Sequence, residues 1–278
     1  MFLILYNPIS RNGANTSVVE KLARKMKRKH EEVRVLSLLE IEDSKEFLSS
    51  LDADTKIILV GGDGTLNRIA NQIAGLEKIP EVYLYKAGTG NDFRRSIKKR
   101  GKITQIDQYL LNLPKVKYNK KQRYFLNGVG LGFDGLVCQI VEESKNKKTK
   151  RNFYASVFAA LKQYQPIDCE VEVDGVTKKY KKAWLVSIMN SKYFGGGMKI
   201  APKASRTDEC LYTVIVHGIS KHKLRLLFPL IYLGWHTKIK GVTIIKGKEV
   251  IVKSNEPTYL QVDGDVVENL TEIKVISK

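Results

Sequence analysis

The chain has 278 residues, 43% of them hydrophobic, and a formal net charge of +19. This length and apolar content allow a substantial core, and the charge indicates attraction to a polyanionic surface or to nucleic acid. The three cysteines, Cys138, Cys169 and Cys210, have no paired spacing, so neither a disulfide framework nor a zinc knuckle is indicated.

The first part of the chain alternates apolar strands with helix-like segments. Strands are predicted at residues 2–6, 33–38, 56–60 and 82–85, and helices around Val18 to Met26, 44–51 and 65–75. Because β-α alternation is typical of a parallel sheet covered on both faces, we expect an α/β domain over residues 1–115.

From residue 116 the pattern changes to short strand-like runs, and we expect a second, antiparallel β domain over residues 116–278. Its predicted strands are 124–126, 169–173, 183–189, 211–216, 242–245 and 249–252, with turns at Asp174-Gly175 and Lys246-Gly247 and helical insertions at 135–164 and 221–236. The start MFLILYNP lacks a basic segment, and the apolar run from Leu226 to Trp235 is too short to span a bilayer. We therefore expect a cytoplasmic or peripheral protein.

The most specific motif is Gly61-Gly62-Asp63-Gly64-Thr65, between the strand KIILV and the predicted helix LNRIANQIAG. Glycines let a backbone approach phosphate closely, and a helix N-terminus offers N–H groups to an anion. A tight strand-to-helix turn explains the glycines equally well, but it does not require an acidic residue among them. The context favours a phosphate site.

Two further loops follow predicted strands and would emerge at the same edge of a parallel sheet. They are Gly88-Thr89-Gly90-Asn91-Asp92-Phe93 and Asn7-Pro8-Ile9-Ser10-Arg11-Asn12-Gly13. Alone, Asn91-Asp92 is equally typical of a helix cap. Three such loops at one edge favour a shared binding site.

Together these motifs resemble those of the diacylglycerol kinase catalytic-domain family, which includes sphingosine, ceramide and bacterial diacylglycerol kinases. The resemblance covers nearly the whole chain. It rests on Asn7 to Arg11, Gly61 to Thr65, Gly88 to Arg95, Asn127 to Asp134, Ala201 to Ala204 and Gln261 to Asp265. It implies a Rossmann-like α/β nucleotide domain followed by a C-terminal antiparallel β-sandwich domain, the plan shared with NAD kinases, and an active site between the two domains. The last residues are expected to return to the first domain.

The resemblance also assigns roles to particular residues. Those implied to bind ATP are Asn7, Pro8, Ile9, Ser10, Arg11, Gly61, Gly62, Asp63, Gly64, Thr65, Leu66, Asn67, Thr89, Asn91 and Asp92. Asp63 and Asp92 would lie near the phosphates and Mg²⁺. Asp263 and Asp265 would be catalytic carboxylates together with Asp63, and Asp265 stands where bacterial relatives place a glutamate that accepts the proton of the lipid hydroxyl.

Three departures from the family pattern bear on function. Arg11 replaces a glycine, and Asp265 is one methylene shorter than the usual glutamate. The segment APKASRTDECL retains only the second of two family aspartates, as Asp208, so a structural Mg²⁺ site there would consist of Asp208 with the carbonyls of Ser205 and Cys210.

Basic residues concentrate in several clusters, which predict binding to an anionic membrane surface. The clusters are 24–29, 94–102, 145–151, 178–182 and 221–225. The segment KHKLRLLFPLIYLGWH joins a basic start to a wide apolar body, as in an interfacial helix, although a core helix has the same pattern. No basic strand interleaved with aromatic residues of the RNA-binding type occurs, so we expect no nucleic-acid partner.

The leading hypothesis is an ATP-dependent lipid kinase that converts diacylglycerol to phosphatidic acid, with sphingoid bases and phosphatidylglycerol as the other acceptors that the sequence leaves open. One alternative is an NAD kinase, which shares Gly-Gly-Asp-Gly-Thr but places an Asn-Glu pair after a mid-chain strand, whereas here the pair Asn255-Glu256 comes late. The other is a non-catalytic lipid-binding regulator, motivated by Arg11 and Asp265. Relatives suggest a homodimer.

Overall fold

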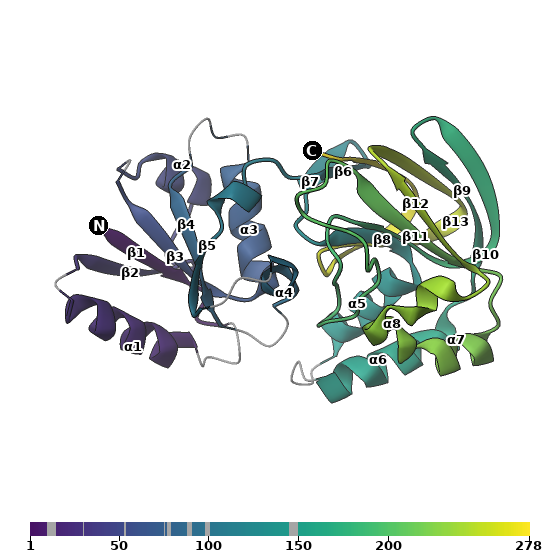
Figure 1. Cartoon of the computed structure of the whole chain (residues 1–278), viewed down its shortest axis with the longest axis horizontal. Helices are drawn as coiled ribbons and strands as arrows, with labels where there is room; N and C mark the ends of the chain where they lie inside the picture. The colour runs from purple at the N-terminus through teal and green to yellow at the C-terminus, as the bar shows by residue number, and fades with distance from the viewer. Residues whose placement is uncertain are drawn as a thin grey trace. The chain divides into compact units, whose positions relative to one another are not determined.

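The computed structural model describes residues 1–9, 15–29, 31–52, 54–74, 76, 79–87, 91–97, 101–144 and 150–278. The chain forms two compact units, Met1–Leu113 and Pro114–Lys278, drawn in Figure 1.

The first unit is built on a five-stranded sheet in the order β2-β1-β3-β4-β5. Its strands are β1 (Phe2–Tyr6), β2 (Val33–Ser37), β3 (Lys56–Gly61), β4 (Glu81–Lys86) and β5 (Ile103–Gln105). The first four are parallel to their neighbours, and β5 pairs antiparallel with β4. The predicted parallel sheet is confirmed; three-residue β5 is too short to show a sequence pattern.

Helices cover both faces of this sheet (Figure 1). They are α1 (Asn15–Lys27), α2 (Ser44–Ser49), α3 (Asp63–Ile73), α4 (Asp92–Ile97) and the 3₁₀ turn η2 (Asp107–Tyr109). The apolar stripe of α1, with Leu22 and Met26, packs against Ile4 and Ile58. Strand alternation turns the neighbouring apolar side chains to the opposite face, where α3 contacts β3.

The second unit is a nine-stranded, antiparallel assembly with the strand order β12-β11-β10-β8-β13-β14-β6-β7, in which β9 pairs with both β10 and β13. The strands are β6 (Lys115–Tyr118), β7 (Lys121–Tyr124), β8 (Gly128–Gly132), β9 (Ile167–Val173), β10 (Val176–Met189), β11 (Leu211–His217), β12 (Val242–Gly247), β13 (Glu249–Val262) and β14 (Asp265–Ile276). Side chains from both ends of the long strands β10 and β13 meet in one core, as in a sandwich. The predicted antiparallel β domain is confirmed.

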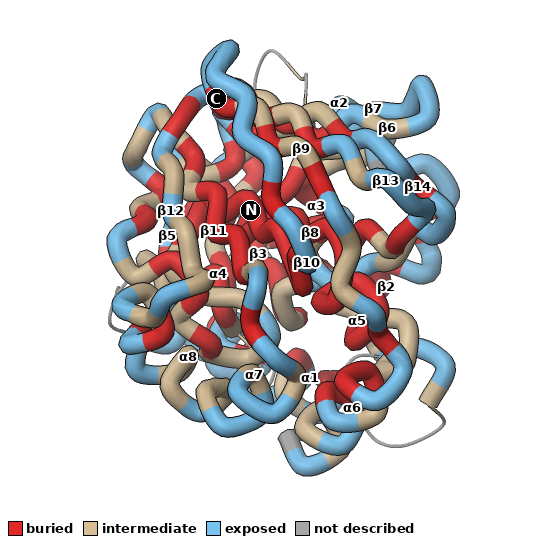
Figure 2. The backbone as a smooth tube through the Cα atoms, turned by 90° about the vertical axis from the view of Figure 1, so that its right-hand side faces the viewer, coloured by how far each residue is buried: buried red, intermediate tan, exposed pale blue. Residues whose placement is uncertain are grey.

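Several helical segments complete the second unit. They are α5 (Phe133–Glu143), α6 (Lys150–Gln163), α7 (Lys221–Leu227), α8 (Leu230–Leu233) and the 3₁₀ turn η3 (Trp235–Lys238). Apolar side chains of α5, α6 and α7 form a second cluster around buried Trp184. Figure 2 shows buried segments in red in α5 and α6, whereas α7 and α8 are tan and pale blue. None of the described helices is long and apolar enough to cross a lipid bilayer.

Two sequence-based expectations differ from the structure in detail. Of the strand expected at 124–126, only Tyr124 lies in a strand, at the end of β7, and β8 begins at Gly128. The helix expected at 221–236 is broken at Pro229 and at Gly234, whose φ is +77°. The last strand, β14, pairs with β13 and β6.

Candidate active site

The loops after β1, β3 and β4 emerge at one edge of the first sheet, because these three strands are parallel neighbours. In the first loop, Asn7 Oδ1 accepts the Ile9 N–H at 3.0 Å, and Asn15 Nδ2 donates to the Asn7 carbonyl at 3.2 Å. Ser10, Arg11 and Thr89 lie outside the described residues. The structure therefore gathers Asn7, the glycine turn formed by Gly61–Thr65 and Asp92 at the predicted edge.

The glycine turn leaves bare backbone at the start of α3. A Cβ on Gly61 would lie 2.5 Å from Thr65 Cβ, so packing alone demands that glycine. At Gly62 and Gly64, in contrast, an added Cβ would meet nothing within 4 Å. Packing does not demand these two glycines, and bare backbone at a helix N-terminus is the geometry that admits a phosphate group.

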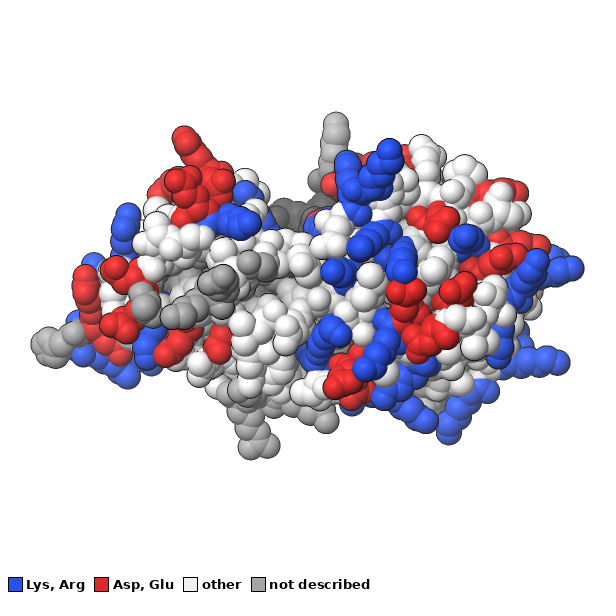
Figure 3. Space-filling view, turned by 90° about the horizontal axis from the view of Figure 1, so that it is seen from above, with Lys and Arg blue, Asp and Glu red and all other residues white. Residues whose placement is uncertain are grey.

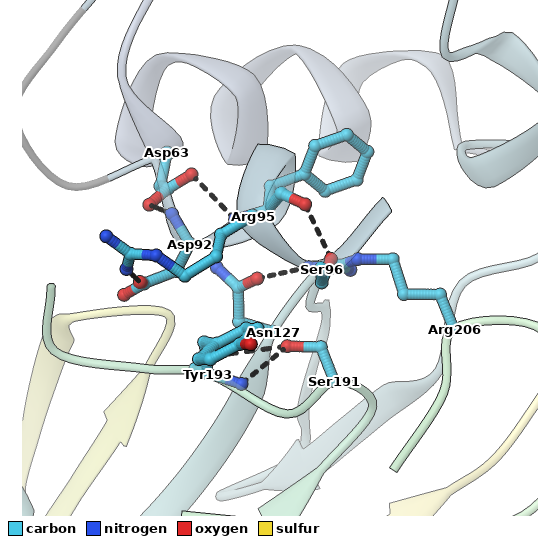
Figure 4. A network of polar contacts seen from close by, with 9 residues as sticks. Asp63, Asp92, Arg95, Ser96, Asn127, Ser191, Tyr193 and Arg206 are labelled. Atoms are coloured by element: carbon cyan, nitrogen blue, oxygen red, sulfur yellow. Dashed lines mark hydrogen bonds and ion pairs between the residues drawn. The ribbon is translucent and has the colours of Figure 1, made fainter. Parts of the chain in front are cut away.

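Asp63 joins the second and third loops. Its carboxylate accepts the backbone N–H of Asp92 at 2.7 Å and of Phe93 at 3.2 Å, and so caps the N-terminus of α4 (Figure 4). Buried Asp92 in turn pairs with Arg95 at 2.8 Å. Asp63 therefore holds the loop that carries Asp92, a role that the motif alone did not reveal.

The remaining residues of this group lie behind the turn or beside it. Leu66 and Asn67 are buried within α3, and Asn71 Nδ2 donates to the Asn67 carbonyl at 3.0 Å. Asn91 adopts a left-handed backbone with φ of +48° just before α4. Arg94, although part of a predicted basic cluster, is buried and donates to Thr104 Oγ1 at 3.2 Å.

The two candidate catalytic carboxylates of the second unit flank a tight hairpin turn. Asp263 and Gly264 form the turn between β13 and β14, with φ of +50° and +100°, and Val262 pairs with Asp265. Asp263 and Asp265 therefore do not lie on one plain strand, and their surroundings differ.

Asp263 is oriented inward. Its carboxylate accepts the N–H groups of Leu126, Asn127 at 2.8 Å and Gly128 at 3.1 Å. Burial raises the pKa of Asp263, while these hydrogen bonds act in the opposite direction. Asp263 thus anchors the segment that leads into β8.

Asp265 is oriented outward. Its side chain is 66% exposed and forms an ion pair with Arg123 of β7. Of the two carboxylates, Asp265 is the one open to an incoming group. The sequence did not single out Arg123, which lies far from Asp265 along the chain.

A buried arginine braces the same segment. Arg206 donates to the Leu126 carbonyl and to Asn127 Oδ1, and Asn190 Nδ2 donates to the Leu126 carbonyl at 2.9 Å. Figure 4 includes Asn127 and Arg206. The only sequence signal for Arg206 was its place in the APKASRTDECL segment. Together Arg206 and Asp263 fix residues 126–128.

A second buried carboxyl, Asp134, lies against β8. Ser187 Oγ donates to Asp134 Oδ2 at 3.0 Å, and Gln261 Nε2 donates to the same oxygen at 3.4 Å. A Cβ on Gly130 would overlap this carboxyl group, which explains the glycine there. Burial raises the pKa of Asp134 to about 6.

The residues expected to hold structural Mg²⁺ take part in other contacts in this structure. Asp208 Oδ2 accepts the Tyr212 hydroxyl at 3.2 Å and pairs with Lys246 at 3.7 Å, so a lysine ammonium already supplies positive charge. The Ser205 carbonyl accepts the Asp208 N–H at 3.0 Å, and Cys210 is a partly buried free thiol. No group of three or more His, Cys, Asp or Glu that could bind a metal occurs within the described ranges.

An apolar cavity of about 60 Å³ lies inside the second unit, between the helices and the sheet. Its lining includes Phe133, Leu161, Leu224, Phe228, Ile231 and His236. His236 Nε2 donates to the Ile200 carbonyl at 2.9 Å, and Nδ1 has no hydrogen-bond partner in the part of the chain described. Burial lowers the pKa of His236, which favours a neutral imidazole with a buried Nδ1.

Comparison with known proteins gives matches over both units. Residues 1–117 match the diacylglycerol kinase catalytic domain, and residues 127–276 match the YegS C-terminal NAD kinase beta sandwich-like domain. A diacylglycerol kinase of Staphylococcus carnosus (strain TM300) is 28% identical over 272 residues, covering 94% of this chain and 87% of that protein.

Two solved structures share the fold. A diacylglycerol kinase from Bacillus anthracis str. Sterne has a TM-score of 0.65 at 20% identity, covering 99% of this chain and 93% of that one. Yeast NADH kinase complexed with NADH has a TM-score of 0.52 at 13% identity, covering 100% and 80%. The catalytic-domain family model matches the first unit and the sandwich-domain model matches the second. Together they show that this chain belongs to the diacylglycerol kinase catalytic-domain family.

Proposed function

We propose that this protein is an ATP-dependent lipid kinase that transfers the γ-phosphoryl group of ATP to a lipid hydroxyl, with diacylglycerol as the acceptor. The observation that carries this proposal is the bare backbone at Gly62 and Gly64, where packing demands no glycine, within a chain of the diacylglycerol kinase family.

The nucleotide would bind at the shared loop edge of the first unit. The N-terminus of α3 directs N–H groups and the positive end of its dipole toward phosphate. Asp63 and Asp92 hold the neighbouring loop in place through the Asp63 cap on α4. Magnesium bound to the phosphate oxygens would neutralise the charge that develops during transfer.

The lipid would be held by the second unit. The cavity beneath α7 and α8 is apolar, as an acyl chain is, but at about 60 Å³ it would admit only part of such a chain, since ligand pockets are typically about 300 Å³ or more.

Asp265 is the carboxylate that we propose to accept the proton of the lipid hydroxyl. It is exposed, whereas both oxygens of Asp263 accept backbone N–H groups. Asp263 would act by shaping the turn on which Asp265 stands. Phosphoryl transfer depends mainly on positioning and electrostatics, so a rigid turn is a suitable support for the base.

NAD kinase is the second candidate, because the beta-sandwich model and yeast NADH kinase share this fold. The apolar lining of the cavity favours a lipid over a dinucleotide, whose ribose and phosphate groups need several polar partners.

The deciding experiment incubates the protein with γ-labelled ATP, magnesium and separate acceptors. The acceptors are diacylglycerol, a sphingoid base, phosphatidylglycerol and NAD. We expect label in the organic phase with diacylglycerol. Label in NAD and in no lipid would identify an NAD kinase, and no transfer to any acceptor would favour a non-catalytic regulator.

A further inference from the structure

The outer side of α7, α8 and η3 exposes large apolar side chains. Leu226 is 78%, Trp235 59% and Leu233 53% exposed. The inner sides of the same helices already face the interior, since Leu224, Leu227 and Ile231 line the apolar cavity. The outer apolar side chains therefore cannot be buried by a simple rotation of the helices.

Basic residues flank these apolar residues in the sequence. Lys223, Arg225, Lys238 and Lys240 are exposed, and none of them forms an ion pair within the described residues. The Arg225 guanidinium lies 5.4 Å from the ring centroid of half-exposed Phe158, which extends the surface onto α6. We call the exposed residues Lys223, Arg225, Leu226, Leu233, Trp235, Lys238 and Lys240 the α7–η3 surface.

The sequence around this surface contains no acidic residue to balance its positive charge. No Asp or Glu occurs between Glu209 and Glu249. On the strands, in contrast, lysines are paired, as in Lys179–Glu170 at 2.9 Å and Lys274–Glu249 at 2.8 Å. On the face drawn in Figure 3, Lys and Arg side chains likewise lie next to Asp and Glu side chains. The α7–η3 surface thus differs from the strands because it combines exposed apolar side chains with basic side chains that form no ion pair within the described residues.

We propose that the α7–η3 surface docks the protein on an anionic lipid bilayer. Leu226, Leu233 and Trp235 enter the boundary between headgroups and acyl chains, and the surrounding Lys and Arg side chains bind headgroup phosphates. This deepens the proposed function, because the cavity assigned to the acyl chain is lined by the inner sides of the same helices.

Charge complementarity selects the bilayer over a second copy of the chain. Two copies paired through this surface would bring like charges together in a desolvated contact, which is unfavourable. An anionic bilayer supplies both the opposite charge and an apolar layer. Trp235 also favours the bilayer, because tryptophan is enriched at membrane–water interfaces.

The test measures partitioning of the full chain onto vesicles without nucleotide. The vesicles contain phosphatidylcholine alone or phosphatidylcholine with phosphatidylserine. Tryptophan emission reports insertion: Trp235 is exposed, whereas Trp184 is buried and donates to the Ile219 carbonyl at 2.7 Å, so Trp184 gives a constant background. We expect binding and a blue shift with the anionic vesicles only.

Variants locate the binding surface. Lys223→Glu with Lys238→Glu should weaken partitioning by about tenfold or more. Lys178→Glu with Lys181→Glu, two exposed lysines of β10, makes the same change in net charge and should have a much smaller effect. Leu226→Ser should weaken binding and reduce the blue shift. Equal losses for the two charge pairs, or equal binding to neutral vesicles, would overturn the proposal.

Two further measurements separate this proposal from its alternatives. Sedimentation without lipid should give the same species for wild type and Leu226→Ser, and self-association abolished by Leu226→Ser would assign the surface to an interface between copies. Activity on a short-chain diacylglycerol dispersed in water should be unchanged in Leu226→Ser. Absence of that activity in wild type would refute the kinase while leaving the vesicle result to decide the docking surface.

Discussion

Asp265 and Asp263 show how two carboxylates on one turn can differ in role. Asp263 is partly buried and accepts three backbone N–H groups, whereas Asp265 is exposed beside Arg123. A buried acceptor that satisfies several donors is costly to remove, because each donor loses its partner. An exposed ion pair contributes little to stability, about 1 kcal/mol or less. The effects of Asp265 substitutions on rate and on stability should therefore separate.

Asp265→Asn should lower kcat by about 10² to 10⁴ if Asp265 is the general base, while the affinity for ATP stays nearly constant. Asp265→Glu, which restores the residue usual in the resembled family, should retain or raise activity. Steady-state kinetics and urea unfolding measure the two effects. Glu268→Gln, exposed on the same strand, is the matched control. Full activity in Asp265→Asn would remove Asp265 from the chemistry.

At this scale the sequence predicted the bare glycine turn but not the partners of its residues. Gly61 to Thr65 form a contiguous motif in a strand-turn-helix context, which short-range physics can interpret. The Asp63 cap on α4, the Arg123–Asp265 pair and the Arg206 contacts join residues distant in the chain. Only the folded structure specifies which distant residues meet.

Among the elements, β8 shows how packing fixes residue choice. Its sequence GVGLG lacks the β-branched alternation of a typical strand, yet all five residues are buried. Gly130 faces the Asp134 carboxyl group, which occupies the space of a side chain. β8 was therefore missed in the sequence, because its glycines reflect what lies opposite them rather than local preference.

Gly130→Ala should destabilise the second unit by about 1 to 3 kcal/mol or more, because the added methyl group overlaps Asp134. In an Asp134→Ala background the methyl group has room, and the cost should be much smaller. Urea unfolding of the four proteins of this double-mutant cycle measures the coupling. Additive effects would show that Gly130 is required for another reason.

Strand β13 was predicted only in part, for a reason that lies in its own sequence. β13 runs through Pro257, a residue that normally ends a central strand, and a register shift between Lys253 and Thr258 accommodates it. The predicted strand therefore stopped at residue 252. Conversely, the strong alternation of β1, β3 and β4 with helices made the parallel sheet predictable.

On the scale of the whole molecule, the pH dependence of stability should carry a signature of Asp134. Its pKa is raised from 3.8 to about 6, so between these values the folded state holds a proton that the unfolded state has released. The free energy of unfolding should therefore fall as pH rises from about 4 to 6. At 1.36 kcal/mol per pKa unit, Asp134 accounts for about 3 kcal/mol of that fall.

Asp134→Asn should remove this contribution. The difference in unfolding free energy between wild type and Asp134→Asn isolates it from His217 and His236, whose lowered pKa values act in the opposite direction. Tryptophan fluorescence follows the second unit, since Trp184 and Trp235 both lie in it. A difference that does not vary with pH would contradict the assignment.

The measurement that tests the central claim most directly is ATP binding by Gly64→Ala. The space beside Gly64 is open, and alanine favours a helix by at most about 1 kcal/mol over glycine, so the variant should be as stable as wild type or slightly more stable. If the bare backbone there binds phosphate, the added methyl group should weaken ATP binding by about tenfold or more, which corresponds to roughly 1.4 kcal/mol. Titration calorimetry with ATP, paired with thermal unfolding, measures both quantities. Undiminished ATP affinity in a stably folded Gly64→Ala would contradict a nucleotide site at this turn.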